Sequence, residues 1–198
     1  MRQRLLIAPA LAGAVACAGC GDGPLGQEGG VQLAPAQAGV PAPSGERSLH
    51  KATLLPLGDS RGAGTAEMEV TGGYLRVRIH ATGIVPSENI PQHIHLNPGC
   101  DPGGPVLVNL DARLSVPGEA PGVGAGYPVA NRAGELHYEA SRPLDDLRSA
   151  LNTWGGAGLD DTAELLAFLD LEDRSVHMHV AFGPPYPAVT CGGIDRIH

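Results

Sequence analysis

The sequence contains few aromatic residues and no cluster of basic residues. Phe, Tyr and Trp together make up 4% of the 198 residues, and 13 Lys and Arg residues are outnumbered by 21 Asp and Glu residues. Nucleic acids are bound chiefly through clustered positive charge, so the formal net charge of −8 argues against such a partner. Gly (29) and Pro (18) are abundant instead, and this composition favours turns and short strands over a helical bundle.

The N-terminal apolar stretch is too short to span a bilayer as a permanent helix. Two arginines precede the run Leu5–Ala16, a pattern typical of a signal peptide. Ala18-Gly19-Cys20 follows and resembles the lipobox of bacterial lipoproteins, which makes Cys20 the predicted lipidated residue. Modification of Cys17, or a plain secretory signal, is the alternative. We therefore expect residues 1–19 to be a lipoprotein signal peptide. The protein would then be anchored by its lipid in the cell envelope, on the periplasmic or extracellular face.

Residues 20–47 are predicted to be a flexible tether. They are rich in Gly, Pro, Ala and Gln and show no apolar periodicity. Such a segment cannot bury enough surface to offset the conformational entropy lost on folding. The folded domain is therefore expected to cover residues 48–198.

Alternation of apolar and polar residues predicts an antiparallel β-domain. Residues 65–71 and 74–81 both alternate, and Gly72-Gly73 between them indicates a tight hairpin turn. Further strands are expected at residues 51–57, 91–96, 105–110, 135–140, 174–181 and 189–194. Around residues 143–170 the spacing becomes helical, with Leu144, Leu147 and Leu151 in one segment and an acidic start at Asp160-Asp161 in the next. We therefore predict a helical insertion there.

Two His-x-His pairs are the candidate binding residues. In a strand, residues i and i+2 point to the same face, so His93-Ile94-His95 and His177-Met178-His179 each offer two imidazoles on one side. If the strands are neighbours, all four rings converge on one ion. Imidazole suits zinc, copper, iron or nickel, and a flat four-nitrogen set suits Cu(II). The predicted ligands are His93, His95, His177 and His179, whereas ordinary polar surface is the alternative. The other histidines, His50, His80, His137 and His198, are interpreted as surface residues, and of these only His137 is considered as a further ligand.

Cys100 and Cys191 are the two cysteines that remain beside the signal region. In an oxidising envelope such a pair favours a disulfide, which would join the loop after the first His pair to the last strand. Two buried free thiols are the alternative.

Residues 64–102 resemble the first half of bacterial periplasmic copper/zinc superoxide dismutases. In that family a His-x-His-x4-Cys pattern carries two copper-binding histidines and a disulfide cysteine, which His93, His95 and Cys100 match. His179 takes the place of a later copper-binding histidine, and Cys191 that of the disulfide partner. The resemblance implies a Greek-key, immunoglobulin-like β-sandwich or barrel, a copper cofactor and superoxide dismutation. It extends over residues 48–111 and 172–195 and leaves the middle unaligned.

The departures from the family pattern are equally specific. Residues 101–136 contain no histidine, so the zinc site and the bridging histidine are expected to be absent, and His177 would serve as the fourth copper ligand. Ala188 stands where the family has an arginine that guides superoxide. Arg142 and Arg174 are the candidates to replace it. The missing arginine therefore argues against fast dismutation.

A second resemblance points away from catalysis. His93-Ile94-His95 followed by Gly104-Pro105-Val106 is similar to the pattern of CHRD domains, which are typically not known as enzymes. The alternative function is thus a non-catalytic copper-binding or CHRD-like envelope protein. The cysteine pair favours the dismutase resemblance, whereas the missing zinc ligands and arginine favour the binding module.

Overall fold

The computed structural model describes residues 47–101, 104–119, 126–180 and 188–197. All of them belong to one compact unit of the chain. The predicted signal peptide, Cys20 and all of the predicted tether except Arg47 lie outside the described residues, so these interpretations stay predictions. No helix of the described residues is long and apolar enough to cross a membrane.

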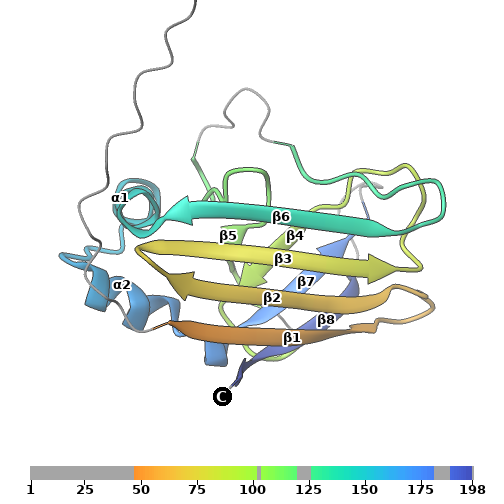
Figure 1. Cartoon of the computed structure of the whole chain (residues 1–198), viewed down its shortest axis with the longest axis horizontal. Helices are drawn as coiled ribbons and strands as arrows, with labels where there is room; N and C mark the ends of the chain where they lie inside the picture. The colour runs from red at the N-terminus through yellow and green to blue at the C-terminus, as the bar shows by residue number, and fades with distance from the viewer. Residues whose placement is uncertain (1–46, 102–103, 120–125, 181–187, 198) are drawn as a thin grey trace, which may run out of the picture. The chain divides into compact units, whose positions relative to one another are not determined.

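Eight antiparallel strands form one continuous sheet that curls on itself (Figure 1). The strands are β1 (Ser48–Pro56), β2 (Ala63–Thr71), β3 (Tyr74–Thr82), β4 (Gln92–His95), β5 (Val106–Asn109), β6 (Leu136–Pro143), β7 (Ser175–His179) and β8 (Ala188–Ile197). Their spatial order is β5-β4-β7-β8-β1-β2-β3-β6. Strand β8 pairs with both β7 and β1 and so joins the two halves of the sheet.

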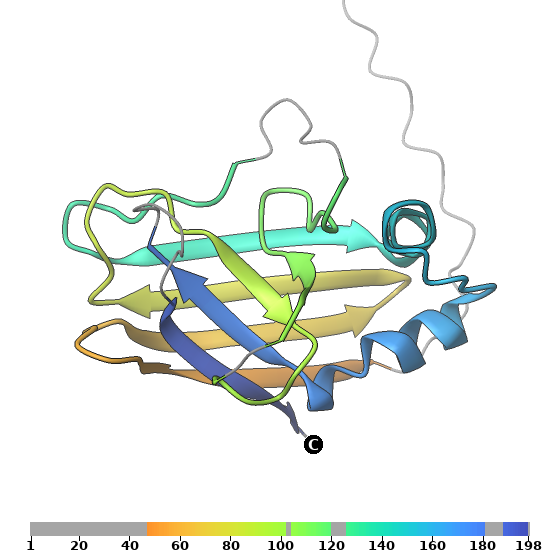
Figure 2. The same ribbon diagram turned by 180° about the vertical axis from the view of Figure 1, so that it is seen from behind.

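The two halves of the sheet lie one behind the other. Figure 2, the view from the back, shows β5, β4, β7 and β8 crossing obliquely in front of β1, β2, β3 and β6. The chain passes to the second half after β3, returns for β6, and crosses again for β7. This interleaved order confirms the predicted all-β Greek-key sandwich or barrel.

The core between the halves is almost entirely aliphatic. Met68 and Val77 of the first half are fully buried, as are Ile94 and Met178 of the second. Each of these residues alternates with more polar neighbours along its strand, as the period of a strand requires. The hairpin between β2 and β3 turns at two glycines in the left-handed region, with φ of 56° at Gly72 and 78° at the following glycine, which the predicted two-residue turn needs.

Two helices stand where helical spacing predicts them. Helix α1 (Leu144–Gly155) follows β6 directly, and α2 (Thr162–Leu169) is capped by the Asp161 side chain, which accepts a hydrogen bond from the Glu164 N–H at 2.9 Å. A short 3-10 helix, η1 (Leu171–Asp173), leads into β7. Both helices lie at one end of the strands, and β7 runs away from them (Figure 2). His179, its last residue, is thus at the end far from the helices.

The interpretation of His50 as a surface residue is wrong. His50 is only 7% exposed and lies in β1, where its Nε2 is 3.3 Å from the Ser48 hydroxyl. Burial is the largest influence on its pKa, which is lowered, although the charge of Glu172 acts in the opposite direction. His80 and His137 are exposed as expected, and their rings stack 4.4 Å apart on the paired strands β3 and β6. His198 lies outside the described residues.

The predicted disulfide is present. Cys100 and Cys191 are bonded across a sequence separation of 91 residues. The bond ties the segment after β4 to strand β8, which is the neighbour of β7. The loop that it closes contains β7, and β4 ends five residues before Cys100.

Replacing both cysteines with alanine, Cys100→Ala with Cys191→Ala, is expected to lower the free energy of unfolding by about 4–5 kcal/mol, because an open loop of this length gains entropy in the unfolded chain. Urea unfolding of the oxidised protein measures the difference. A thiol reductant should bring the wild type to the level of the variant and leave the variant unchanged. Equal stability of variant and oxidised wild type would contradict this role of the bond.

Candidate metal centre

Strands β4 and β7 are antiparallel neighbours, the condition on which a shared site depends. His93 lies directly opposite His177 in their register. Ile94 of β4 and Val176 and Met178 of β7 point into the core. Because side chains alternate along a strand, the histidines on either side of these residues project from the outer face of the sheet.

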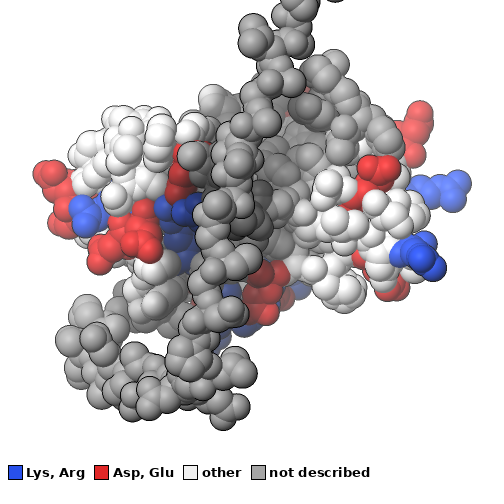
Figure 3. All heavy atoms as spheres, turned by 90° about the horizontal axis from the view of Figure 1, so that it is seen from above, with Lys and Arg blue, Asp and Glu red and all other residues white. Residues whose placement is uncertain are grey.

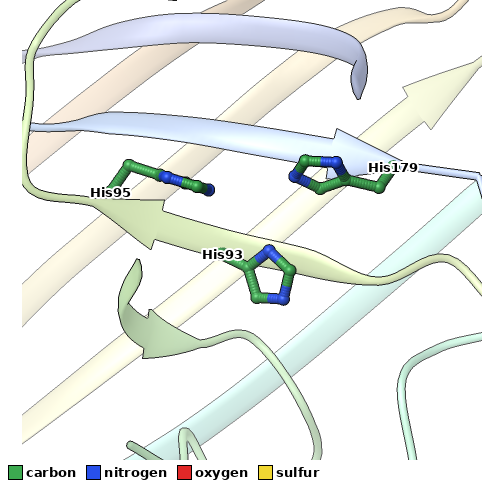
Figure 4. A group of neighbouring side chains, drawn as sticks. All are labelled: His93, His95 and His179. Carbon is green, nitrogen blue, oxygen red and sulfur yellow. The ribbon is translucent and has the colours of Figure 1, made fainter. Parts of the chain in front are cut away.

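Three of the four predicted ligands form one group. His93, His95 and His179 each offer a ring nitrogen, and these atoms lie within 4.8 Å of one another. Figure 4 shows the three rings, two from β4 and one from the end of β7, turned toward a common point. The ring centroids of His93 and His179, which come from different strands, are 5.2 Å apart. The arrangement could hold a metal ion.

Hydrogen bonds on the far side orient two of the rings. His93 Nε2 is 2.9 Å from the hydroxyl oxygen of Tyr127, and His95 Nδ1 is 2.7 Å from the carbonyl oxygen of Gly104. The opposite ring atoms, His93 Nδ1 and His95 Nε2, are buried and have no hydrogen-bond partner. A buried polar atom without a partner is costly. A ring that is hydrogen-bonded through one nitrogen and free at the other is the usual state of a metal-binding histidine.

The carbonyl that orients His95 depends on a glycine. Gly104 has φ of 76°, and a Cβ atom there would lie 2.8 Å from the Asn97 side chain. Only glycine adopts this conformation readily. A carbonyl oxygen can only accept, so His95 Nδ1 carries the proton and Nε2 keeps its lone pair. The sequence pattern Gly104-Pro105-Val106 pointed to this segment, although not to its contact with His95.

His177 is placed differently from the other three histidines. Its ring packs against His95 with centroids 4.3 Å apart, and its Nε2 is 3.1 Å from the Ser175 hydroxyl oxygen. It forms a second group, with a ring nitrogen within 4.8 Å of the sulfur atoms of Cys100 and Cys191. Those sulfur atoms are joined in the disulfide, and thiolates are what a metal would bind.

The strand pairing is irregular beside two of the histidines, His95 and His179. The register of β7 with β8 shifts between Met178 and His179, and that of β4 with β5 shifts between Ile94 and His95. Such shifts bend a strand and re-aim its side chains. Residue spacing predicted four equivalent ligands, whereas the ring nitrogens form one group of three histidines and a second group of His177 with the two cysteines.

Burial lowers the pKa values of His93 and His177 and keeps these two rings neutral. Burial first, and then the nearby histidines, lowers the pKa of His93 to about 3. The same causes, in the same order, lower the pKa of His177 to about 4. Burial and the charge of Asp111 raise the pKa of Tyr127 to about 12, so its hydroxyl group stays protonated. Neutral imidazole is the form that binds metals.

The two arginines considered as guides for an anion have partners of their own. Arg142 is buried and bonds both carboxylate oxygens of Glu119, at 2.8 and 3.0 Å. Arg174 donates to the carbonyl oxygens of Leu96 and Phe168, each at 3.0 Å. Both guanidinium groups therefore hold loops and helix ends in place.

Stability of the metal-free protein is expected to fall as the pH drops. The pKa values of His93 and His177 lie below the usual 6.5 in the folded state, so the unfolded state binds more protons in this window. The stabilisation is complete above pH 6.5 and is lost as the pH falls toward about 4. Urea unfolding between about pH 8 and about pH 5 measures it.

The double variant His93→Gln with His177→Gln should show a shallower pH dependence. His80→Gln with His137→Gln, the exposed stacked pair, is the matched control and should keep the wild-type slope. A flat profile in the wild type would contradict the assignment of these neutral buried rings.

No protein-family model matches the sequence, and no curated protein matches it. The geometry of the three-histidine group, together with the sequence resemblance, is therefore the basis for the function proposed next.

Proposed function

We propose that this chain binds a single copper ion through His93, His95 and His179. The observation that carries the proposal is the convergence of three ring nitrogens from two adjoining strands within 4.8 Å of one another. Two of these rings are already oriented for binding by hydrogen bonds on their other nitrogen. The ion would satisfy buried nitrogen atoms that have no protein partner, His93 Nδ1 and His95 Nε2.

Copper is preferred over a structural zinc ion on chemical grounds. Structural zinc sites are usually closed by four protein ligands, often cysteines, whereas here the two nearby cysteines are oxidised. Copper(II) binds nitrogen ligands more strongly than the other divalent ions of its series. The His-x-His-x4-Cys spacing, with its cysteine in a disulfide, adds to the resemblance to copper/zinc superoxide dismutases.

Superoxide dismutation is the reaction we propose for the loaded protein. A bound copper ion supplies the alternation between Cu(II) and Cu(I) that this reaction needs. His93, His95 and His179 would hold the metal, and three protein ligands would leave it able to bind a small anion. Lipid attachment at Cys20 would place this chemistry in the cell envelope.

A non-catalytic copper-binding envelope protein is the second candidate. It is favoured by Ala188, which stands where the resemblance places a guiding arginine, and by the hydrogen bonds that hold Arg142 and Arg174 to other groups. On the face seen in Figure 3, the described Lys and Arg side chains are interspersed with Asp and Glu. An acidic protein without a positive guide attracts superoxide poorly.

Substitution of a proposed ligand should remove the metal. The wild-type chain is expected to bind one copper ion, and His93→Ala, His95→Ala and His179→Ala should each weaken binding by at least about 100-fold, since even loss of an outer-shell contact costs 10- to 100-fold. Isothermal titration and elemental analysis measure affinity and stoichiometry. His177→Ala, on the same face of β7, is the matched control and should still bind one ion. Equal loss in the control would show a four-histidine site, and binding of zinc alone would contradict the assignment of copper.

The rate at which the copper-loaded protein consumes superoxide, and the dependence of this rate on ionic strength, separate the two candidate functions. Salt screens the repulsion between an acidic protein of net charge −8 and an anion, so superoxide consumption by the copper-loaded chain should rise a few-fold as salt increases. Pulse radiolysis or a competition assay gives the rate. Consumption no faster than the spontaneous dismutation in metal-free buffer would leave the binding function alone.

A further inference from the structure

The nitrogen of His93 that binds a metal must carry no proton. The two nitrogens of an isolated neutral imidazole are not distinguished in this way, so the surroundings of His93 select which of them is free. In neutral imidazole one nitrogen carries hydrogen and the other a lone pair, and the hydrogen bond at one nitrogen selects the tautomer. His93 Nε2 faces the hydroxyl oxygen of Tyr127 at 2.9 Å. A hydroxyl group can donate or accept, so the other partner of Tyr127 determines its role toward His93.

A buried carboxylate stands at the start of a chain of hydrogen bonds that ends at Tyr127. Asp111 Oδ1 accepts from the backbone N–H groups of Arg113 and Ser115, at 2.9 and 3.1 Å. Asp111 Oδ2 is 2.5 Å from the Ser115 hydroxyl oxygen, a distance typical of a hydroxyl donating to a carboxylate. The single hydroxyl hydrogen of Ser115 is therefore donated to Asp111, and the Ser115 oxygen can only accept hydrogen bonds from other groups.

The orientation of Asn109 follows from Ser115. Asn109 Nδ2 donates to the Ser115 hydroxyl oxygen at 3.0 Å. Its amide oxygen Oδ1 consequently faces the Tyr127 hydroxyl group, at 3.3 Å. An amide oxygen only accepts, so Tyr127 donates its proton to Asn109. The Tyr127 oxygen is left with lone pairs on the side of His93.

We infer that Tyr127 is a positioning residue of the centre, whose hydroxyl oxygen accepts a hydrogen bond from His93 Nε2 and so keeps His93 Nδ1 free to bind the metal. Nδ1 is the ring atom that is buried without a hydrogen-bond partner. Asn109 pairs directly with His93 across β4 and β5, so the chain of hydrogen bonds is built on the strand beside the ligand. The inference rests on the proposed function for the identity of the bound group, but the tautomer does not depend on it.

Nitrogen NMR of the metal-free wild-type protein tests the direction of these hydrogen bonds without any substitution. The side-chain signals of His93 should show hydrogen on Nε2 and none on Nδ1. Hydrogen on Nδ1 would overturn the inference. Because no metal is present, this result is separate from the proposed function: the expected tautomer with no copper binding would refute the copper proposal and leave the orienting contact in place.

Tyr127→Phe removes the hydroxyl group and retains the ring. The variant should show His93 as a mixture of tautomers and should bind copper about 10- to 100-fold more weakly, the usual effect of losing an outer hydrogen bond. Tyr138→Phe is the matched control, because the hydroxyl group of Tyr138 is also buried and donates to the Asp111 carbonyl oxygen at 2.7 Å. The control should keep the wild-type tautomer and affinity. Wild-type tautomer and affinity in Tyr127→Phe would also overturn the inference.

Discussion

The antiparallel pairing of β4 with β7 is the constraint on which the candidate centre depends. These strands come from distant parts of the chain, and their hydrogen bonds place His93 opposite His177. The same alternation that turns Ile94 and Met178 into the core turns the histidines outward. Core and site are therefore opposite faces of one pair of strands, and a slip of one residue in the register would exchange them.

Several contacts around this pair restrict its geometry. The disulfide ties the segment after β4 to β8, which is hydrogen-bonded to β7. The carbonyl of Gly104 and the hydroxyl group of Tyr127 orient the two rings of β4 from the side opposite the proposed metal. Prior orientation of this kind reduces the entropy that ligand ordering would cost on binding.

The surroundings of the histidines favour binding of a metal cation more than attraction of an anionic substrate. Burial, and after it the charges of nearby histidines, lowers the pKa values of His93 and His177, and neutral imidazole is the form that binds a cation. A substrate anion has less to attract it, because Arg142 and Arg174 serve the packing of loops and helix ends. The sequence resemblance to copper/zinc superoxide dismutases thus rests on the candidate ligands and the cysteine pair, and does not extend to a guiding arginine, since Ala188 stands at that place.

The sequence by itself determined the strands, the Gly72-Gly73 hairpin, both helices and the pairing of Cys100 with Cys191. These features follow from local alternation, helical spacing and the small number of cysteines, which need no knowledge of distant neighbours. Only the tertiary structure decided that the ring nitrogen of His177 lies with the disulfide sulfurs rather than in the group of three histidines, that His50 is buried, and that Tyr127 contacts His93. Each of these depends on strand register or on contacts between segments far apart in the chain, about which residue spacing carries no information.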